Sequence, residues 1–330
     1  MINRPKAEYG GFLPLELNDG QEHFIKYKDF LRRYNSIKAA LYYLIETLPV
    51  RRIYIPYYYC PTTTDAIKCT GIDVLFYHIN DDLLPEELPD ESGSAVLLVN
   101  YFGVRSGELR KLTDNFRNSV VIADNAHSFF SEPVMRDGIY QVYSAKKFFG
   151  VPDGAYLVGS SVAPAGETTG YSHNYAGFLL TSYEAGTNAA YSMKKAADKV
   201  IADSPGNMSS LALGLLRNVD YGRTFRRRED NFSILHQRVG NYNELSLPDR
   251  CAAYLYPFLL AGRGRELKRY LIQNRIYVPT LWSGDDLLKN GNDFELSMSD
   301  DAVFLPVDQR YDSDDMNYIA ESLISFLRRS

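Results

Sequence analysis

The feature that most constrains the fold is a regular alternation of strand-like and helix-like segments over the first half of the chain. Strand-like runs lie at residues 52–58, 72–79, 95–102, 119–123, 139–144 and 154–158, with helix-compatible stretches at 35–48, 62–69 and 107–116. Several of the runs are almost continuous in Val, Ile and Leu, as is typical of strands that helices cover on both faces. The alternation therefore predicts an α/β fold with a mostly parallel sheet.

The second half of the chain has a different pattern. Residues 181–202 and 209–239 are rich in Ala, Leu, Lys and Arg and favour two long helices. Short strands are expected at 276–279 and 302–305, and helices at 266–273 and 315–327. This mixture predicts a smaller α+β C-terminal domain, so we expect a large domain over residues 1–215 and a small domain over 216–330. Because the sequence contains no long linker, the two domains should pack closely.

Charge and composition exclude several classes of function. The 330-residue chain has a net charge of -5, which argues against nucleic acid or an anionic membrane as the main partner. Its start, MINRPKAEYGG, lacks the apolar core of a signal peptide, and no apolar run reaches the roughly 18 residues that span a bilayer. Three scattered cysteines and five scattered histidines fit neither a disulfide framework nor a metal site. We therefore expect a cytoplasmic protein without a metal.

The first candidate for chemistry is Asp124, which follows the apolar run Val120-Val121-Ile122-Ala123. An acid in this position lies at the carboxyl end of a predicted central strand, the edge at which open α/β sheets bind ligands. A carboxylate there can keep a pyridine nitrogen protonated, so that the ring withdraws electrons. The alternative is an aspartate that only begins a loop or caps a helix.

The second candidate is Lys147, which follows another strand-like run and precedes two phenylalanines and a Gly/Pro turn. Burial among such neighbours lowers the pKa of a lysine and frees its amine for covalent chemistry with a carbonyl group. Ser144 lies three residues earlier, close enough for its hydroxyl to reach a phosphate beside the same ligand. The alternative is that Lys146 and Lys147 form an exposed basic pair.

The third candidate is Ser36, at the start of the first predicted helix. Free backbone N–H groups behind such a serine form an anion site, although an ordinary helix cap is the alternative. The sequence contains neither G-x-G-x-x-G after a strand nor G-x-x-x-x-G-K-[ST], which argues against dinucleotide and P-loop sites.

The order and spacing of these three motifs resemble the DegT/DnrJ/EryC1/StrS sugar aminotransferases, a family of fold-type I enzymes that use pyridoxal 5'-phosphate (PLP). The resemblance includes these segments: Tyr9-Gly-Gly-Phe12, Asn35-Ser36, Ile55-Pro-Tyr-Tyr58, Asp124-Asn-Ala-His127, Ser144-Ala-Lys-Lys147 with Pro152-Asp-Gly154, and Leu305-Pro-Val-Asp-Gln-Arg-Tyr311. It implies an aspartate-aminotransferase-like fold, with a large PLP-binding domain and a smaller C-terminal domain.

The resemblance also implies roles for individual residues. Lys147 matches the lysine that holds PLP covalently and moves the substrate proton, and Asp124 matches the partner of the pyridine nitrogen. His127 stands where the family commonly has Gln, beside the phenolic oxygen of the cofactor. Ser36, the backbone of Ile37 and Ser144 match residues that contact the phosphate of PLP. One of Tyr57, Tyr58, Tyr59 or Cys60 matches the residue that lies against the ring. Asn174 matches an asparagine that reaches the PLP phosphate in the partner subunit.

By the same resemblance, the chain is expected to be a homodimer with shared active sites. It would transfer an amino group, from glutamate as donor, to a keto sugar that is typically nucleotide-linked, in amino-sugar or surface-polysaccharide biosynthesis. Two positions depart from the family pattern, because Ile37 and Ala155 each replace a usual glycine. The alternatives are a PLP-dependent sugar dehydratase, although dehydrating relatives have histidine in place of Lys147, and a non-catalytic or regulatory protein.

Three further residues are candidates of lower rank. Trp282, Arg310 and Tyr311 are placed to line a substrate pocket, with core packing as the alternative for the tryptophan. The pair Arg227-Arg228 is expected to lie on a solvated face of a helix.

Overall fold

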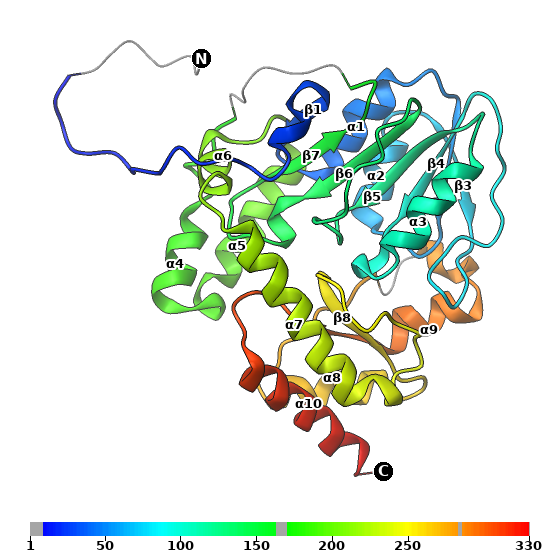
Figure 1. Ribbon diagram of the computed structural model, residues 1–330, viewed down its shortest axis with the longest axis vertical. Coiled ribbons are helices and arrows are strands. Elements are labelled where there is room, and N and C mark those ends of the chain that lie inside the picture. Colours follow the sequence, from blue (N-terminus) through cyan, green and yellow to red (C-terminus); the bar gives the residue numbers. More distant parts are fainter. Residues whose placement is uncertain (1–8, 163–169, 283–285, 330) are drawn as a thin grey trace.

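A seven-stranded sheet forms the centre of the larger part of the molecule (Figure 1). The computed structural model describes residues 9–162, 170–282 and 286–329, so the first eight residues, where we expect no signal peptide, lie outside it. The strand order is β1-β7-β6-β5-β4-β2-β3. The strands are β1 (Leu31–Tyr34), β2 (Arg52–Pro56), β3 (Asp73–Tyr77), β4 (Ser94–Val99), β5 (Val120–Asn125), β6 (Ile139–Ser144) and β7 (Ala155–Val158).

Strands β2 to β6 run parallel to one another, whereas β7 pairs antiparallel with both β6 and β1. Every residue of β4 is buried, which agrees with its continuous run of apolar side chains. The structure thus confirms the predicted α/β fold and the six predicted strands of the sheet. The short edge strand β1 was not predicted.

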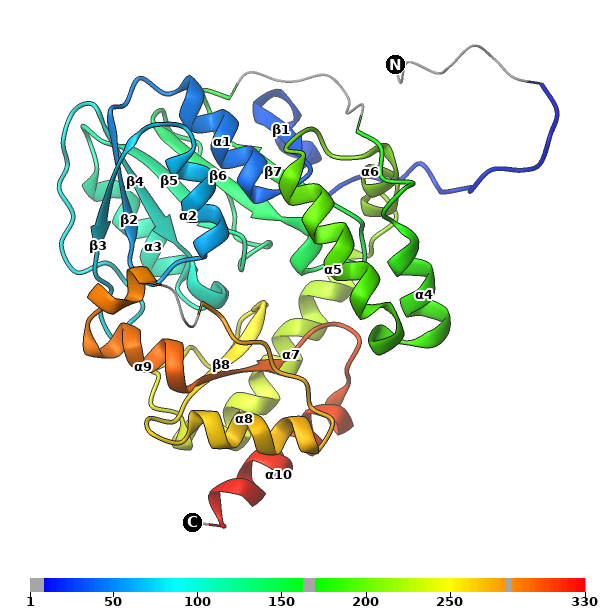
Figure 2. The ribbon, with the colours of Figure 1, turned by 180° about the vertical axis from the view of Figure 1, so that it is seen from behind.

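Helices cover both faces of the sheet. Helices α1 (Ile37–Thr47) and α2 (Pro61–Lys68) lie on one face, and α3 (Ser106–Leu112) lies on the other (Figures 1 and 2). Helix α1 begins where predicted, because the Ser36 side chain accepts a hydrogen bond from the backbone N–H of Ala39 at 3.2 Å. Its buried side includes Leu41 and Leu44, which pack toward the sheet.

Each of the two predicted long helices is a pair of helices. Gly186, with φ of +88°, separates α4 (Gly177–Ala185) from α5 (Thr187–Asp203), and the two form a hairpin beside the sheet. Helix α6 (Ser210–Leu216) ends before α7 (Tyr221–Val239), which starts anew at Asp220 because that side chain accepts from the backbone N–H of Arg223 at 2.8 Å. Composition indicated helix in both regions but did not locate these breaks.

The smaller part is built on an antiparallel pair of strands, β8 (Leu255–Leu259) and β9 (Ala302–Pro306). Around them lie α7, α8 (Gly264–Gln273), α9 (Asp293–Asp301) and α10 (Ser313–Leu327). The prediction of a strand at residues 276–279 was wrong, because β8 takes the place beside β9. Residues 276–279 belong to neither a helix nor a strand.

One apolar core joins the two parts. It runs without interruption from Leu41 in α1 through Leu97 in β4 to Phe258 in β8 and Leu323 in α10. The buried carboxylate of Glu295 in α9 also accepts from the backbone N–H of Ile79 at 2.9 Å. The close packing expected from the absence of a linker is therefore present. Across the residues that the structure describes, no helix has the length and apolar character to cross a membrane.

Candidate active site

A cavity of about 660 Å³ opens at the carboxyl ends of the parallel strands. It is lined by Val99 at the end of β4, Asp124 near the end of β5 and Ser144 at the end of β6. This edge is where α/β sheets bind ligands, and the volume is ordinary for a small-molecule site. The motifs singled out in the sequence therefore meet at one place in the fold.

Asp124 forms the floor of this cavity. Its side chain is buried, its Oδ1 atom accepts from the backbone N–H of Ala126 at 2.8 Å, and its Oδ2 atom accepts from the hydroxyl of Tyr59 at 2.5 Å. Burial raises the pKa of Asp124, while the Tyr59 hydrogen bond and the nearby Lys147 work against that rise. The carboxylate is thus fixed in orientation and lies in a low-dielectric environment.

Lys147 extends into the same cavity from the short turn that follows β6. Its Nζ atom lies 2.6 Å from Nε2 of His127 and 5.4 Å from the centre of the Tyr254 ring. Burial lowers the pKa of Lys147, and the electrostatic influence of the nearby Cys60 and Asp124 offsets the effect only in part. Lys146 also lines this cavity, where its ammonium group pairs with Asp198 of α5 at 2.7 Å.

His127 is held flat between aromatic rings. The parallel ring of Trp282 lies 5.6 Å from it at an angle of 4°, and Tyr254 stacks at 4.9 Å. Burial lowers its pKa well below the usual range, so the imidazole is neutral. Its Nδ1 atom accepts from the backbone N–H of Phe102 at 3.4 Å, which leaves the proton on Nε2. The ring therefore directs its Nε2–H toward the Lys147 amine.

Part of the cavity lining is suited to an anion. The N-terminus of α1 lines the cavity through Ser36, Ile37 and Lys38, and Ser144 lines it as well. The Ser36 hydroxyl accepts a hydrogen bond from the backbone N–H of Ala39. The first N–H groups of α1 have no acceptor within the helix. A helix N-terminus with a serine and a lysine is a favourable site for phosphate.

These residues fit PLP. A buried amine, a buried carboxylate and an anion site line one cavity, and these are the three groups that an aromatic aldehyde with a ring nitrogen and a phosphate requires. No group of three or more His, Cys, Asp or Glu side chains among the described residues is arranged to hold a metal ion.

Comparisons with known proteins agree with this geometry. No family model matches the chain, and no curated protein matches it in sequence. Solved structures do match it in fold. The sugar aminotransferase CalS13 from Micromonospora echinospora has a TM-score of 0.61 at 15% identity, with 89% of this chain and 87% of that chain covered. A DegT DnrJ EryC1 StrS aminotransferase from Brucella abortus has a TM-score of 0.58 at 12% identity, with 91% and 87% covered.

The chain has the fold of the PLP-dependent sugar aminotransferases. The same fold occurs in the E. coli GDP-4-keto-6-deoxy-D-mannose-3-dehydratase with bound hydrated PLP, which matches with a TM-score of 0.63 at 16% identity and covers 91% of this chain and 89% of that one. The resemblance read from the sequence is therefore confirmed at the level of the fold, which aminotransferases share with a dehydratase.

Within this aminotransferase fold, two of the expected cofactor contacts lie outside the cavity lining. Tyr58 is fully buried behind the cavity, where its hydroxyl donates to the carbonyl of Leu281 at 3.2 Å. Asn174 is exposed in the segment before α4, away from the cavity of its own chain. Of the aromatic run, Tyr59 lines the cavity, and so does the adjacent Cys60.

Sequence reasoning missed several charged residues at the cavity mouth. Lys194, Asp198 and Lys199 of α5 lie there, and Lys194 pairs with Asp198 at 2.5 Å. Their spacing of four and five residues on one predicted helix was the available signal, but nothing in the sequence indicated that this face would turn toward the sheet.

The expectation for Arg228 was wrong. Its side chain is only 1% exposed, and its Nη1 atom donates to the carbonyls of Ala253 at 2.9 Å and Tyr254 at 3.2 Å. The guanidinium also lies 4.4 Å from the centre of the Phe148 ring. Its partners come from other parts of the chain, which is why helix periodicity alone did not find them.

Proposed function

We propose that this chain is a PLP-dependent aminotransferase that moves an amino group from a donor amino acid, glutamate by resemblance, to a keto sugar, typically nucleotide-linked. The observation that carries the proposal is the presence of Lys147 and Asp124 in one buried cavity at the carboxyl ends of β5 and β6. An amino-sugar or surface-polysaccharide pathway in the cytoplasm would be the setting.

The side chains around the cavity would have separate roles in the reaction. When bound, PLP supplies an electron-withdrawing ring that stabilises negative charge on the carbon losing its proton. Lys147 would hold the cofactor and carry that proton as a general acid–base, a role that suits its lowered pKa. Asp124 would hold the proton on the ring nitrogen. Ser36, Ser144 and the N-terminus of α1 would bind the phosphate, and His127 would direct its Nε2–H toward the reacting end.

The test is a half-reaction with glutamate. Purified protein is loaded with PLP, glutamate is added, and the visible absorbance of the cofactor is followed together with the release of 2-oxoglutarate. With the wild type, we expect the spectrum to change and one equivalent of 2-oxoglutarate to form. With Lys147→Ala, we expect neither the spectral change nor the release of 2-oxoglutarate. Lys26→Ala, which removes an exposed lysine from a surface ion pair, serves as the matched control. Failure with every amino acid in a full set would contradict the proposal.

A sugar dehydratase is the second candidate, because the dehydratase structure matches with a TM-score similar to those of the aminotransferases. The presence of Lys147 favours the aminotransferase, since dehydrating relatives have histidine at that position. With ¹⁵N-labelled glutamate and a keto sugar, incorporation of the label into the sugar supports transamination, and loss of water without the label supports dehydration.

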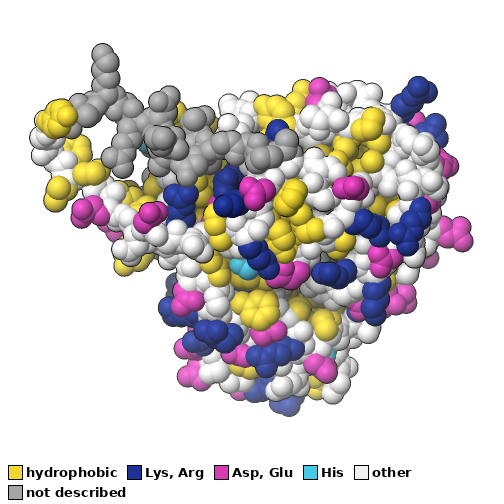
Figure 3. All heavy atoms as spheres, turned by 45° about the horizontal axis from the view of Figure 1, so that its top comes forward, with side chains coloured by type: hydrophobic (Ala, Val, Ile, Leu, Met, Phe, Trp, Pro, Cys, Tyr) yellow, Lys and Arg dark blue, Asp and Glu magenta, His cyan; other side chains and the backbone are white. Residues whose placement is uncertain are grey.

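We also propose a homodimer. Large apolar side chains are exposed on the α4–α5 hairpin, including Leu180 and Tyr183, and on the N-terminal arm, including Phe12 and Leu13. Figure 3 shows hydrophobic side chains along this extended arm. Exposed patches of this kind are typical of protein–protein interfaces. Light scattering should give twice the monomer mass for the wild type, and Tyr183→Asp should shift the mass toward the monomer. Asn174 is then expected to reach the cofactor phosphate of the partner subunit.

A further inference from the structure

Three consecutive tyrosines follow β2, and their side chains have different partners. Tyr57 stacks on a histidine ring with a distance of 4.6 Å between the ring centres, and the hydroxyl of Tyr58 donates to the carbonyl of Leu281 at 3.2 Å. Tyr59 lines the first cavity, where its hydroxyl donates to Oδ2 of Asp124 at 2.5 Å. Of the three tyrosines, Tyr59 is therefore the one that contacts the candidate cofactor site.

The position of the Tyr59 phenol is fixed by its surroundings. Its side chain is 2% exposed, and its backbone N–H donates to the carbonyl of Tyr57 at 3.0 Å. Its ring lies against that of Trp282, with 6.2 Å between the ring centres. Helix α2 begins two residues later, at Pro61, so the chain belongs to regular elements on both sides of the turn. The hydroxyl is thus preorganised toward Asp124.

Asp124 requires such a donor because its carboxylate is buried. Burial raises the pKa of Asp124, since a low-dielectric environment disfavours the ionised form. A neutral aspartic acid would carry its own proton and could not keep another one on a ring nitrogen. The Tyr59 hydrogen bond opposes the rise in pKa more strongly than the charge of Lys147 or the backbone N–H of Ala126 does.

The other groups around Asp124 do not provide a constant substitute for this hydrogen bond. The titratable side chains near its carboxylate come from four segments of the chain, and they are Tyr59, Cys60, Tyr101, His127 and Lys147. Among these five, Lys147 is the one whose positive charge lowers the pKa of Asp124. Its amine is also the group that the proposed reaction uses, so its charge changes as the reaction proceeds. The Tyr59 hydroxyl keeps its proton throughout, because burial raises the pKa of the phenol well above its usual range.

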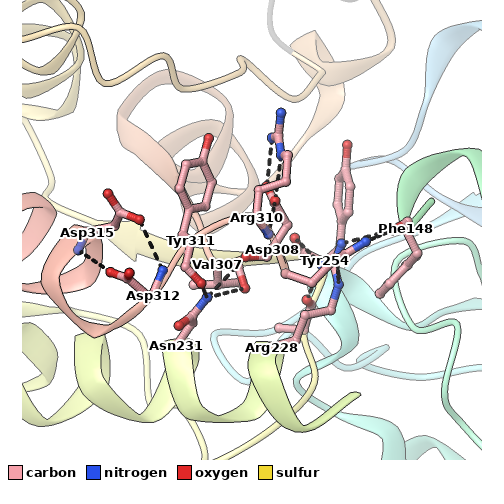
Figure 4. Close-up of polar contacts among 12 residues, drawn as sticks. Phe148, Arg228, Asn231, Tyr254, Val307, Asp308, Arg310, Tyr311, Asp312 and Asp315 are labelled. Carbon is pink, nitrogen blue, oxygen red and sulfur yellow. Dashed lines mark hydrogen bonds and ion pairs between the residues drawn. The ribbon is translucent and has the colours of Figure 1, made fainter. Parts of the chain in front are cut away.

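Two arginines of the smaller part of the molecule have other partners. Arg228 donates to backbone carbonyl groups, and Arg310 pairs with Asp308 at 2.7 Å (Figure 4). Arg310 and Tyr311, both expected in a substrate pocket, line a second cavity of about 510 Å³. Neither guanidinium is among the groups that shift the pKa of Asp124.

The hydrogen bond from Tyr59 leaves room for a ring nitrogen. A carboxylate offers about four lone-pair sites, two on each oxygen. Oδ1 of Asp124 accepts from the backbone N–H of Ala126 at 2.8 Å, and Oδ2 accepts from Tyr59. Each oxygen therefore keeps one lone pair, and a ring N–H can bind without displacing the phenol.

We propose that Tyr59 is a positioning residue, which holds Asp124 as an oriented carboxylate for the ring nitrogen of PLP. The inference rests on the proposed function for the identity of the cofactor. It goes further by assigning the ionised state of Asp124 to one phenol, a role different from the ring contact that the sequence resemblance implied for this segment.

The first test follows the ionisation of Asp124 in the full-length protein without PLP. Aspartate labelled with ¹³C at the side-chain carboxyl carbon is incorporated, the signals are followed by NMR as the pH is varied, and Asp124→Asn identifies the signal of interest. In Tyr59→Phe, which keeps the ring and removes the hydroxyl, we expect the midpoint to rise by about one pH unit, as for the loss of a hydrogen bond to a charged group. Tyr58→Phe is the matched control, because it removes a buried hydroxyl with a hydrogen bond from the adjacent residue and should leave the midpoint unchanged.

The second test observes the cofactor directly. PLP labelled with ¹⁵N in the ring is bound to each protein, and the ¹⁵N chemical shift reports whether the ring nitrogen carries a proton. We expect a protonated nitrogen in the wild type and in Tyr58→Phe, and a shift toward the value of unprotonated pyridine in Tyr59→Phe.

Three results would overturn the assignment. They are an unchanged midpoint in Tyr59→Phe, an equal change in Tyr58→Phe, and a raised midpoint with a ring nitrogen that stays fully protonated. Failure of the wild type to bind PLP would instead reject the proposed function. The carboxyl titration would then still decide whether Tyr59 keeps Asp124 ionised, because that measurement contains no PLP.

Discussion

Nε2 of His127 lies 2.6 Å from Nζ of Lys147, and burial lowers the pKa of both groups. The backbone N–H of Phe102 occupies Nδ1, so the imidazole directs its N–H toward the lysine amine. A neutral amine is the nucleophilic form of lysine. The pair thus keeps Lys147 ready to react with a carbonyl group.

The first prediction concerns pH. Because the pKa of Lys147 is lowered from 10.5, the rate of PLP capture should rise with pH and level off below 10.5. The Asp124 carboxylate raises the lysine pKa, so Asp124→Asn should move the profile to lower pH. Stopped-flow absorbance after mixing with PLP gives both profiles. A midpoint at or above that of a free lysine, or a shift of the variant to higher pH, would contradict the account.

The second prediction separates binding from chemistry at Asp124. Asp124→Asn keeps the size of the side chain but removes the charge that would hold a proton on the ring nitrogen. We expect PLP still to bind and the half-reaction with glutamate to slow by about 100-fold, as for other preorganised electrostatic groups. Single-turnover absorbance measures the rate. A variant that transaminates at the wild-type rate would rule out this role for Asp124.

The third prediction compares two helix caps of the same kind. Ser36 caps α1 and Ser209 caps α6, with hydrogen bonds of 3.2 Å and 3.1 Å to backbone N–H groups. Replacing either serine by alanine should lower the free energy of unfolding by about 1 kcal/mol. Only Ser36→Ala should also weaken PLP binding, measured by fluorescence titration, because only α1 faces the cavity. Equal effects of the two variants on PLP affinity would argue against the phosphate site.

The fourth prediction concerns Arg228, whose pKa burial lowers to about 10. Arg228→Ala leaves the buried carbonyls of Ala253 and Tyr254 without their donor. We expect the free energy of unfolding to fall by about 3 kcal/mol, as for other broken buried networks. Urea denaturation measures the change, and the exposed Arg226→Ala on the same helix should change it by no more than about 0.5 kcal/mol. If Arg228→Ala lowered the free energy of unfolding by no more than the control does, the hydrogen bonds of Arg228 would contribute little to stability.

The sequence was sufficient to predict the central sheet because several of its strands, β4 above all, are buried and almost continuously apolar. The same reasoning located Asp124 and Lys147 at the strand ends, since the carboxyl edge of a parallel sheet is set by topology. The start of α1 was predictable from Ser36 because a helix cap is a local interaction.

The remaining features depend on contacts between distant parts of the chain. Arg228 belongs to a charged, helical stretch, and its burial is decided by the carbonyl groups near residue 253 and by Phe148. Residues 276–279 have a strand-like pattern, but β8 already occupies the place beside β9. The boundary between residues 215 and 216 stays a prediction.

The most direct test of the central claim is to locate the covalent link between PLP and the protein. The protein is incubated with PLP, reduced with sodium borohydride, digested and analysed by mass spectrometry. The account predicts one phosphopyridoxyl group per chain, on Lys147. A group on Lys146 instead, or no stable modification of either lysine, would contradict it.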